Sequence, residues 1–199
     1  MTYLVIGSNN FTGMLPSSLS NHGNLVYLGV WGNNFEGKIA DFLPNGKSLL
    51  YLYVESNSFS GPFRSLGANP TNLLALGPLP SQIIGLPNLA QLSLDDNLIN
   101  GAIPSWVVSL PALDYFNLSN NKLTGHVKEF KPTHLTVVDL SNNNLHGMLP
   151  SSTFKLVNVS SLILSSNNFS DLRKNNFSGT IPDTFAKENF FKTINLDSN

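Results

Sequence analysis

Apolar and polar residues follow one pattern that recurs along the chain, and Asn9, Asn33 and Asn57 mark its period of 24 residues. Residues 135–150 show a complete unit, LTVVDLSNNNLHGMLP. Within it, Val138 and Leu140 flank Asp139, which predicts a short strand over 138–140 with two buried side chains and one exposed. The remaining apolar positions fit neither a helix nor a longer strand. The unit is therefore predicted to be one turn of a solenoid.

Three other positions explain how the chain turns. Asn143 follows the strand, and its amide can satisfy backbone groups that the turn removes from the sheet. Gly147 permits a backbone turn without steric cost, and Pro150 fixes its own φ as the chain crosses to the other side of the coil. Stacked turns bury their apolar edges against one another, and the asparagines should form an internal ladder. Its predicted members are Asn9, Asn33, Asn57, Asn97, Asn121, Asn143, Asn167, Asn175 and Asn199.

The repeat predicts a single solenoid over residues 1–199, with about eight to nine full or partial repeats. Both ends fall inside the repeat pattern, so the solenoid is expected to be uncapped. The period breaks near 73–88, where part of a unit is missing, and near 167–176, where two half-units are joined. An altered gene model, a splice variant or a decayed copy would explain these breaks, and a purposeful irregularity is the alternative.

Composition narrows the possible functions. Only 12% of the residues are charged, and 11 Lys and Arg against 12 Asp and Glu leave no basic stripe for a nucleic acid. Cysteine is absent, so no disulfide or thiolate metal site is expected. The N-terminal residues have only a short apolar run and no basic region, which predicts no signal peptide, and no apolar stretch is long enough for a membrane span.

No pattern in the chain indicates catalysis. HExxH and GxSxG are absent, and the four histidines stand at unrelated positions of the repeat. Gly46-Lys47-Ser48 resembles the end of a phosphate loop, but Asp41 stands where the earlier glycine is required. We therefore expect no enzyme activity, no cofactor and no metal.

The fullest unit, residues 89–104, reads LAQLSLDDNLINGAIP and resembles the plant-specific leucine-rich repeat, LxxLxLxxNxLxGxIP. The discriminating Gly-x-apolar-Pro element recurs in register at Gly13 to Pro16, Gly77 to Pro80, Gly101 to Pro104, Gly147 to Pro150 and Gly179 to Pro182. The resemblance implies an α/β-type solenoid whose parallel β-sheet forms a concave face, with an irregular or 3-10 helical convex side.

Longer phrases such as PSSTFKLVNVSSLILSSNNFS are similar to the ectodomains of plant receptor-like proteins. This resemblance implies a non-enzymatic ligand-recognition module in defence or developmental signalling. It further implies a glycoprotein on the extracellular side of the plasma membrane, with a co-receptor kinase as partner. Two alternatives stay open: a secreted inhibitor similar to polygalacturonase-inhibiting proteins, and a truncated non-functional product or cytosolic scaffold.

A peptide, protein or glycan ligand is expected on the concave face, because this is where leucine-rich repeats usually bind. Tyr and Trp are frequent binding hot spots, and the outward strand positions carry several of them beside acidic residues. The alternative is that the tyrosines only stabilise the sheet through cross-strand packing. The candidate ligand-binding residues are Tyr27, Trp31, Tyr51, Tyr53, Glu55, Asp95, Asp96 and Tyr115.

Five Asn-x-Ser/Thr sequons are candidate glycosylation sites if the protein is secreted. A glycan on Asn117 would project from the concave face and narrow the binding surface. The five acceptor residues are Asn10, Asn117, Asn158, Asn168 and Asn176.

Overall fold

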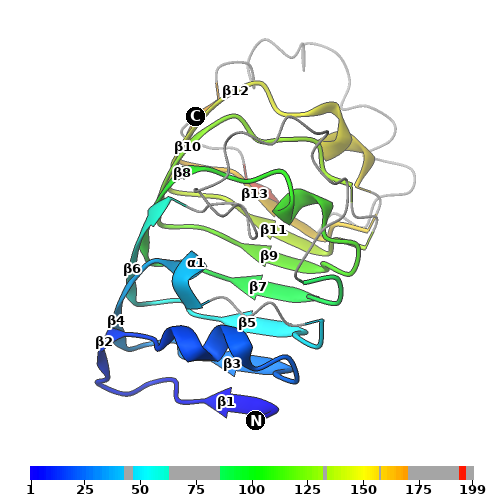
Figure 1. Cartoon of the computed structure of the whole chain (residues 1–199). Coiled ribbons are helices and arrows are strands. Elements are labelled where there is room, and N and C mark those ends of the chain that lie inside the picture. The colour runs from blue at the N-terminus through cyan, green and yellow to red at the C-terminus, as the bar shows by residue number, and fades with distance from the viewer. Residues whose placement is uncertain (43–46, 63–85, 132–133, 157, 170–192, 196–199) are drawn as a thin grey trace, which may run out of the picture.

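The computed structural model describes residues 1–42, 47–62, 86–131, 134–156, 158–169 and 193–195. These residues form the predicted solenoid, in which successive turns stack upward from strand β1 (Tyr3–Val5) near the N-terminus (Figure 1). Seven strands of one parallel sheet are each followed along the chain by a strand of a second parallel sheet.

The first sheet contains the strands that the repeat pattern predicted. Its order follows the chain, because each strand pairs in parallel with the strand of the next turn. The strand expected over 138–140 lies one residue earlier, and Leu140 is buried directly after it. The eight strands are β1 (Tyr3–Val5), β3 (Tyr27–Gly29), β5 (Tyr51–Tyr53), β7 (Gln91–Ser93), β9 (Tyr115–Asn117), β11 (Val137–Asp139), β13 (Ser161–Ile163) and β15 (Thr193–Asn195).

A second parallel sheet, which the sequence analysis did not predict, follows the asparagine of each turn. Its strands start close after the Asn ladder, and all of them except the last include the glycine of the repeat, whose φ is positive, for example 77° at Gly101. The strands are β2 (Thr12–Met14), β4 (Asn34–Gly37), β6 (Ser58–Pro62), β8 (Leu98–Ala102), β10 (Lys122–Gly125), β12 (Asn144–Gly147) and β14 (Asn168–Phe169).

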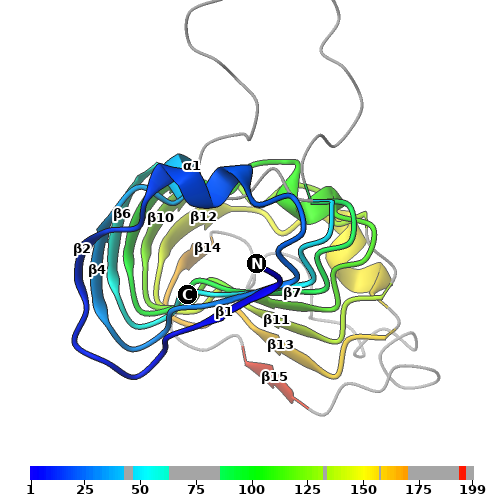
Figure 2. The same ribbon diagram turned by 60° about the horizontal axis from the view of Figure 1, so that its bottom comes forward.

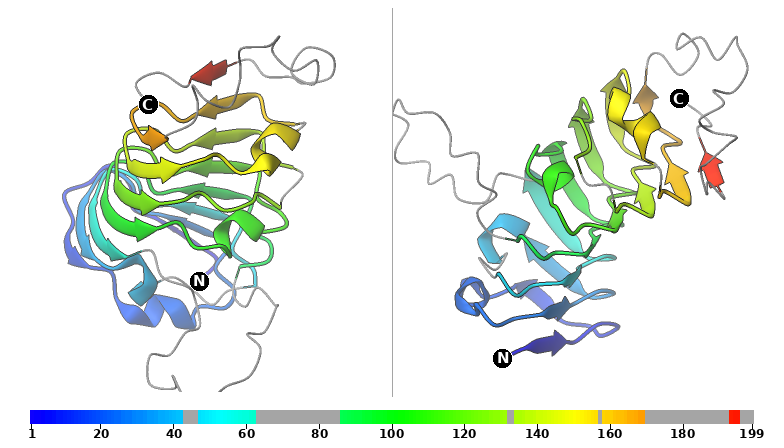
Figure 3. Two further views of the ribbon diagram at one scale, coloured as in Figure 1. Left: turned by 90° about the horizontal axis from the view of Figure 1, so that it is seen from above. Right: turned by 90° about the vertical axis from the view of Figure 1, so that its right-hand side faces the viewer.

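Short helices complete the turns, as the predicted 3-10 helical side requires. In the described residues, three are 3-10 helices, η1 (Ser17–Asn21), η2 (Val107–Ser109) and η3 (Ser151–Lys155), and one is the α-helical turn α1 (Ile39–Phe42). In a view nearly along the coil axis, α1 and the first sheet lie on opposite sides of the coil, and the second sheet forms the side that connects them (Figure 2). None of the helices in the described ranges therefore covers the outward face of the first sheet (Figure 3).

The core is a column of apolar side chains inside the coil. At the middle of consecutive strands of the first sheet, Leu28, Leu52, Leu92, Phe116 and Val138 align in register, and each is at most 1% exposed. Burial of one such side chain contributes about 1.5–3 kcal/mol. The coil is therefore held together by contacts between turns, as expected for a repeat protein.

The predicted asparagine ladder is confirmed in the described turns. Asn121 donates from Nδ2 to the carbonyl oxygens of Leu118 and Ser119 in its own turn and of Leu94 in the preceding turn. Its Oδ1 accepts a hydrogen bond from the backbone N–H of Ile99 at 3.0 Å. Each asparagine thus connects two turns. The same arrangement recurs at Asn33, Asn57, Asn97, Asn143 and Asn167.

The first sheet continues across both places where the repeat period breaks. Strand β5 pairs directly with β7, so that Tyr51 faces Gln91, and β13 pairs directly with β15. The irregular stretches near 73–88 and 167–176 lie largely outside the described residues, as do Asn175 and Asn199. The number of repeats and the nature of the breaks therefore stay predictions.

Candidate functional site

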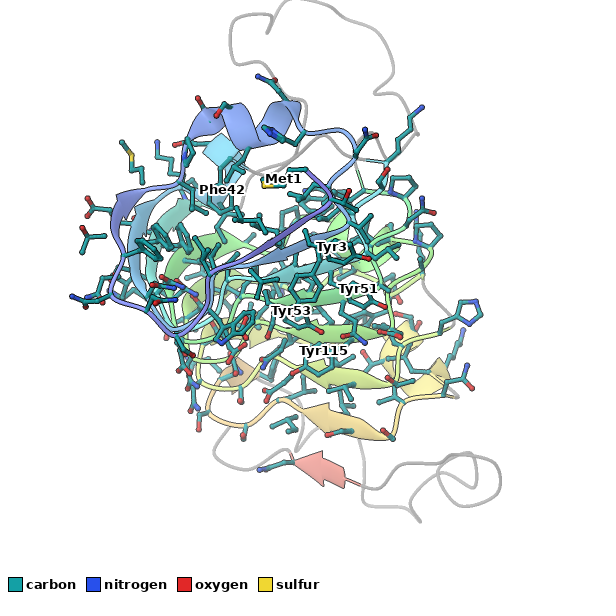
Figure 4. All side chains as sticks on the ribbon, turned by 90° about the horizontal axis from the view of Figure 1, so that it is seen from below. Met1, Tyr3, Phe42, Tyr51, Tyr53 and Tyr115 are labelled. Carbon is teal, nitrogen blue, oxygen red and sulfur yellow. The ribbon has the colours of Figure 1, made fainter. Side chains whose placement is uncertain are left out.

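Four tyrosines form a continuous aromatic surface on the outward face of the first sheet. Tyr27 pairs in register with Tyr3 and Tyr51, and its ring centroid lies 6.5 Å and 5.6 Å from theirs. Tyr53 lies two residues after Tyr51, and its ring centroid is 5.5 Å from that of Tyr27. Figure 4 shows Tyr3, Tyr51 and Tyr53 on this face. We call Tyr3, Tyr27, Tyr51 and Tyr53 the tyrosine cluster.

Trp31 lies next to this cluster because two glycines leave room for it. A Cβ on Gly7 or on Gly29 would overlap the indole ring, so the ring packs against the backbone at both positions. Gly29 occupies the strand position that corresponds to Tyr53 in the next turn. The side chain of Trp31 is only partly buried, and it extends the aromatic surface toward the end of the strands.

Glu55 and Asp95 follow Trp31 at the same place in the next two turns of the sheet. The backbone N–H of Gly32 donates to the carbonyl of Glu55 at 3.0 Å, and that of Ser56 donates to the carbonyl of Asp95 at 3.0 Å. The Asp95 carboxylate accepts a 2.6 Å hydrogen bond from the Ser93 hydroxyl. In the described residues, Oε2 of Glu55 is buried and has no hydrogen-bond partner.

Burial raises the pKa of both carboxyl groups. Loss of water is the largest cause at Glu55 and raises its pKa to about 7, and the nearby charge of Asp95 adds to the effect. A backbone hydrogen bond within Glu55 acts in the opposite direction. Burial also raises the pKa of Asp95, although the hydrogen bond from Ser93 counteracts the change. The pair is therefore easier to protonate than ordinary surface carboxylates.

Gln91 belongs to this surface but was missed in the sequence analysis. It lies between Tyr51 and Tyr115 in the sheet register, and the hydroxyl of Tyr53 donates to its Oε1. Comparing the third residue of every repeat unit would have identified it, because that position holds tyrosine in four other units. The structure thus places Tyr115 on the same face but separates it from Tyr51 by one strand (Figure 4).

Asp96 lies outside the strand. It adopts a left-handed conformation with φ of 50° in the turn after β7, and its side chain is exposed.

In the described part of the chain, no three His, Cys, Asp or Glu side chains come together in a way that could hold a metal ion. The structure therefore brings Tyr27, Trp31, Tyr51, Tyr53, Glu55 and Asp95 together on one face, and their role in binding stays a prediction.

Comparisons with known proteins agree with this architecture. Models of the leucine-rich repeat family match residues 1–22, 80–125 and 134–156. The Arabidopsis receptor kinase HAESA, solved with the peptide hormone IDA and the co-receptor SERK1, is similar with a TM-score of 0.63 and 25% identity. That alignment covers 84% of this chain and 30% of the receptor. The chain folds as a leucine-rich repeat solenoid of the plant type.

Another solved structure similar to this leucine-rich repeat protein is the plant peptide hormone receptor RGFR1 in complex with RGF2. It has a TM-score of 0.60 and 26% identity, and the alignment covers 100% of this chain and 36% of the receptor. A plant ice-binding protein shares the fold alone, with a TM-score of 0.57 and 21% identity over 85% of this chain and 58% of that protein. No curated protein matches the chain. The chain spans about a third of the length of the two receptors.

The structure places four of the five predicted glycosylation sites on this leucine-rich repeat protein. Asn10, Asn158 and Asn168 are exposed, whereas Asn176 lies outside the described residues. Asn117 lies in β9 on the same face as the tyrosine cluster, and its Oδ1 accepts a hydrogen bond from the backbone N–H of Ser119. Use of these sites stays a prediction. None of the described helices has the length and apolar character needed to cross a membrane.

The raised pKa of Glu55 predicts a pH-dependent stability for this leucine-rich repeat protein. Its pKa rises from the ordinary value of 4.5 to about 7 on folding, so the folded state holds the proton more tightly than the unfolded state. The contribution to stability is complete below about pH 4.5 and is lost as the pH rises through about 7. A glutamine at this position does not titrate, so the Glu55→Gln variant should not show this loss of stability.

Urea unfolding at pH 5 and pH 8 tests this prediction. The unmodified chain should lose more stability between these pH values than the Glu55→Gln variant. Glu36→Gln is the matched control, because Glu36 is exposed in β4 on the second sheet. Equal pH dependence in the Glu55→Gln variant and the unmodified chain would contradict the prediction.

Proposed function

We propose that this chain is a non-enzymatic ligand-recognition segment of a plant cell-surface receptor, and that a peptide ligand lies along the outward face of the first sheet. The tyrosine cluster with Trp31 is the observation that carries the proposal. Its rings lie on a face that no described helix covers, and Tyr and Trp residues dominate binding hot spots.

The similar proteins support a peptide as the ligand class. HAESA was solved with a peptide hormone and a co-receptor, and RGFR1 was solved with RGF2. By this analogy the whole protein would act at the extracellular side of the plasma membrane and would signal through a co-receptor kinase. The analogy covers about a third of each receptor, so the evidence specific to this chain is the aromatic face.

Removing two rings from the centre of the tyrosine cluster should weaken ligand binding. Tyr51→Ala combined with Tyr53→Ala should lower the affinity by about 2 kcal/mol or more, which is about thirtyfold. We would screen the 199-residue chain on an array of synthetic dodecapeptides, chitooligosaccharides and oligogalacturonides, and then measure each binder by titration calorimetry.

Two exposed apolar residues outside this face provide the matched control. Met14→Ala combined with Leu98→Ala removes two exposed side chains from the second sheet, and it should leave the affinity unchanged. Circular dichroism and urea unfolding would show that both double variants are folded. Equal affinity in the tyrosine variant would place the site elsewhere, and an array without any binder would contradict the recognition function.

A further inference from the structure

In the described turns, the outward face of the first sheet carries negative charges without positive ones. We consider the third, fifth, seventh and eighth residues of each described turn from β1 to β13, which include the strand positions that point outward. Four of these residues are acidic and none is Lys or Arg: Glu55, Asp95, Asp96 and Asp139. The lysines of the described residues lie in the second sheet, the helices or the connecting segments.

The acidic residues adjoin the aromatic ones in two directions. Trp31, Glu55 and Asp95 occupy equivalent places in three consecutive turns of the sheet. In the other direction, the charge of Glu55 raises the pKa of the Tyr27 and Tyr53 hydroxyl groups, although their burial is the larger cause. The carboxylate of Glu55 therefore lies within electrostatic reach of two rings of the tyrosine cluster.

The charge of Glu55 is only partly stabilised, by a backbone hydrogen bond within the residue. Its Oε2 is buried, and no described residue donates a hydrogen bond to it. The charge that raises its pKa is that of another carboxylate, Asp95. A neutral ligand such as a sugar could donate hydrogen bonds but could not offset the repulsion between the two carboxylates. A cation would do both, and its charge-assisted hydrogen bonds would be roughly twice as strong as neutral ones.

We propose that this face recognises a basic peptide through an arginine side chain, which would lie against the rings of Trp31 and Tyr53 and contact the carboxylates of Glu55 and Asp95. The proposal rests on the ligand-recognition function above and specifies its ligand. A guanidinium group fits this surface because it is planar, stacks on aromatic rings and binds carboxylates through two parallel hydrogen bonds. The ammonium group of lysine matches only the charge.

The test compares three twin peptides that differ only at two positions. The first is Gly-Ser-Gly-Arg-Gly-Arg-Gly-Ser, and its twins carry citrulline or lysine in place of both arginines. Citrulline has nearly the shape of arginine but no charge. Titration calorimetry on the full 199-residue chain should give an affinity about tenfold or more higher for the arginine peptide than for the citrulline twin, with lysine between them.

Variants then locate the contact. Glu55→Gln and Asp95→Asn should each lower the affinity for the arginine peptide by about tenfold and leave that for the citrulline twin unchanged. Glu36→Gln removes a matched carboxylate from the second sheet and should change neither. Trp31→Leu provides a second variant that keeps every charge and should also weaken arginine binding, so the test does not depend on the folding of Glu55→Gln.

The outcomes separate this proposal from the function on which it rests. Equal affinity for the arginine and citrulline peptides would overturn the arginine proposal, as would equal losses in Glu36→Gln and Glu55→Gln. If a neutral peptide or an oligosaccharide on the array binds through Tyr51 and Tyr53 while the arginine peptide does not, the recognition function stands and the arginine proposal fails. If nothing binds, both fail.

Discussion

Replacing Asn143 with alanine should lower the free energy of unfolding by about 2–4 kcal/mol, although the substitution removes only a small polar side chain. Asn143 is 6% exposed, and its Nδ2 lies 2.9 Å, 3.2 Å and 3.1 Å from the carbonyl oxygens of Leu118, Leu140 and Ser141. Its Oδ1 accepts from the N–H of Leu123 at 2.9 Å. In the alanine variant the buried N–H of Leu123 would lose this acceptor, which costs about 1–3 kcal/mol, whereas each of the three carbonyl oxygens keeps another donor. The loss of the Nδ2 hydrogen bonds adds about 1 kcal/mol.

Two variants separate the hydrogen bonds of Asn143 from other effects of the substitution. Asn144→Ala removes the exposed neighbour in β12 and should change the stability by less than about 0.5 kcal/mol. Asn143→Asp keeps an acceptor for Leu123 but loses every donor, so it should also destabilise the coil. Urea unfolding of the three variants measures these differences. A loss in Asn143→Ala that is no larger than the loss in Asn144→Ala would contradict this account of the ladder.

The asparagine ladder could be predicted because its chemistry is local. A side chain that both donates and accepts is needed where each strand ends, and asparagine recurs at that position in one turn after another. The buried column of the first sheet follows in the same way from apolar residues on both sides of an outward residue. Periodicity and side-chain chemistry together therefore specify one turn of the coil.

The second sheet could not be read from the same pattern. A strand such as Asn144–Gly147 contains asparagine, histidine and glycine, which have little preference for strands. It becomes a strand because the equivalent segment of the neighbouring turn lies beside it, as Thr124 pairs with Asn144. The sheet thus depends on the stacking of turns rather than on the residues of any one segment.

The candidate site could be predicted from the sequence only in part. The aromatic residues at outward positions identified the face, and the regular stacking of turns brought Tyr27, Tyr51 and Tyr53 together. The direct pairing of β5 with β7 was not predictable, because it depends on how the chain returns to the coil after residue 62. That pairing places Gln91 beside Tyr51 and Asp95 beside Glu55, so the carboxylate pair at the centre of the site is a result of tertiary structure.

Phe59→Ala should be among the most destabilising substitutions in the chain, with a loss of about 3–5 kcal/mol. The side chain is fully buried, and its ring stacks on Phe35 with centroids 6.4 Å apart and contacts Phe42 at 5.1 Å. Its backbone N–H donates to Oδ1 of Asn97, 38 residues further along the chain. Phe59 therefore lies at the junction where the turn of β5 meets the turn of β7.

A cavity at this junction should weaken the contact between the N-terminal turns and the rest of the coil. In the Phe59→Ala variant, the backbone amides of Leu28 and Leu52 should exchange hydrogen faster than that of Val138, because stability in a repeat protein depends on contacts between neighbouring turns. Phe59→Leu retains most of the apolar volume and should cost clearly less than Phe59→Ala. A loss below about 1 kcal/mol in Phe59→Ala, or uniform exchange along the chain, would show that the two groups of turns do not depend on this ring for their contact.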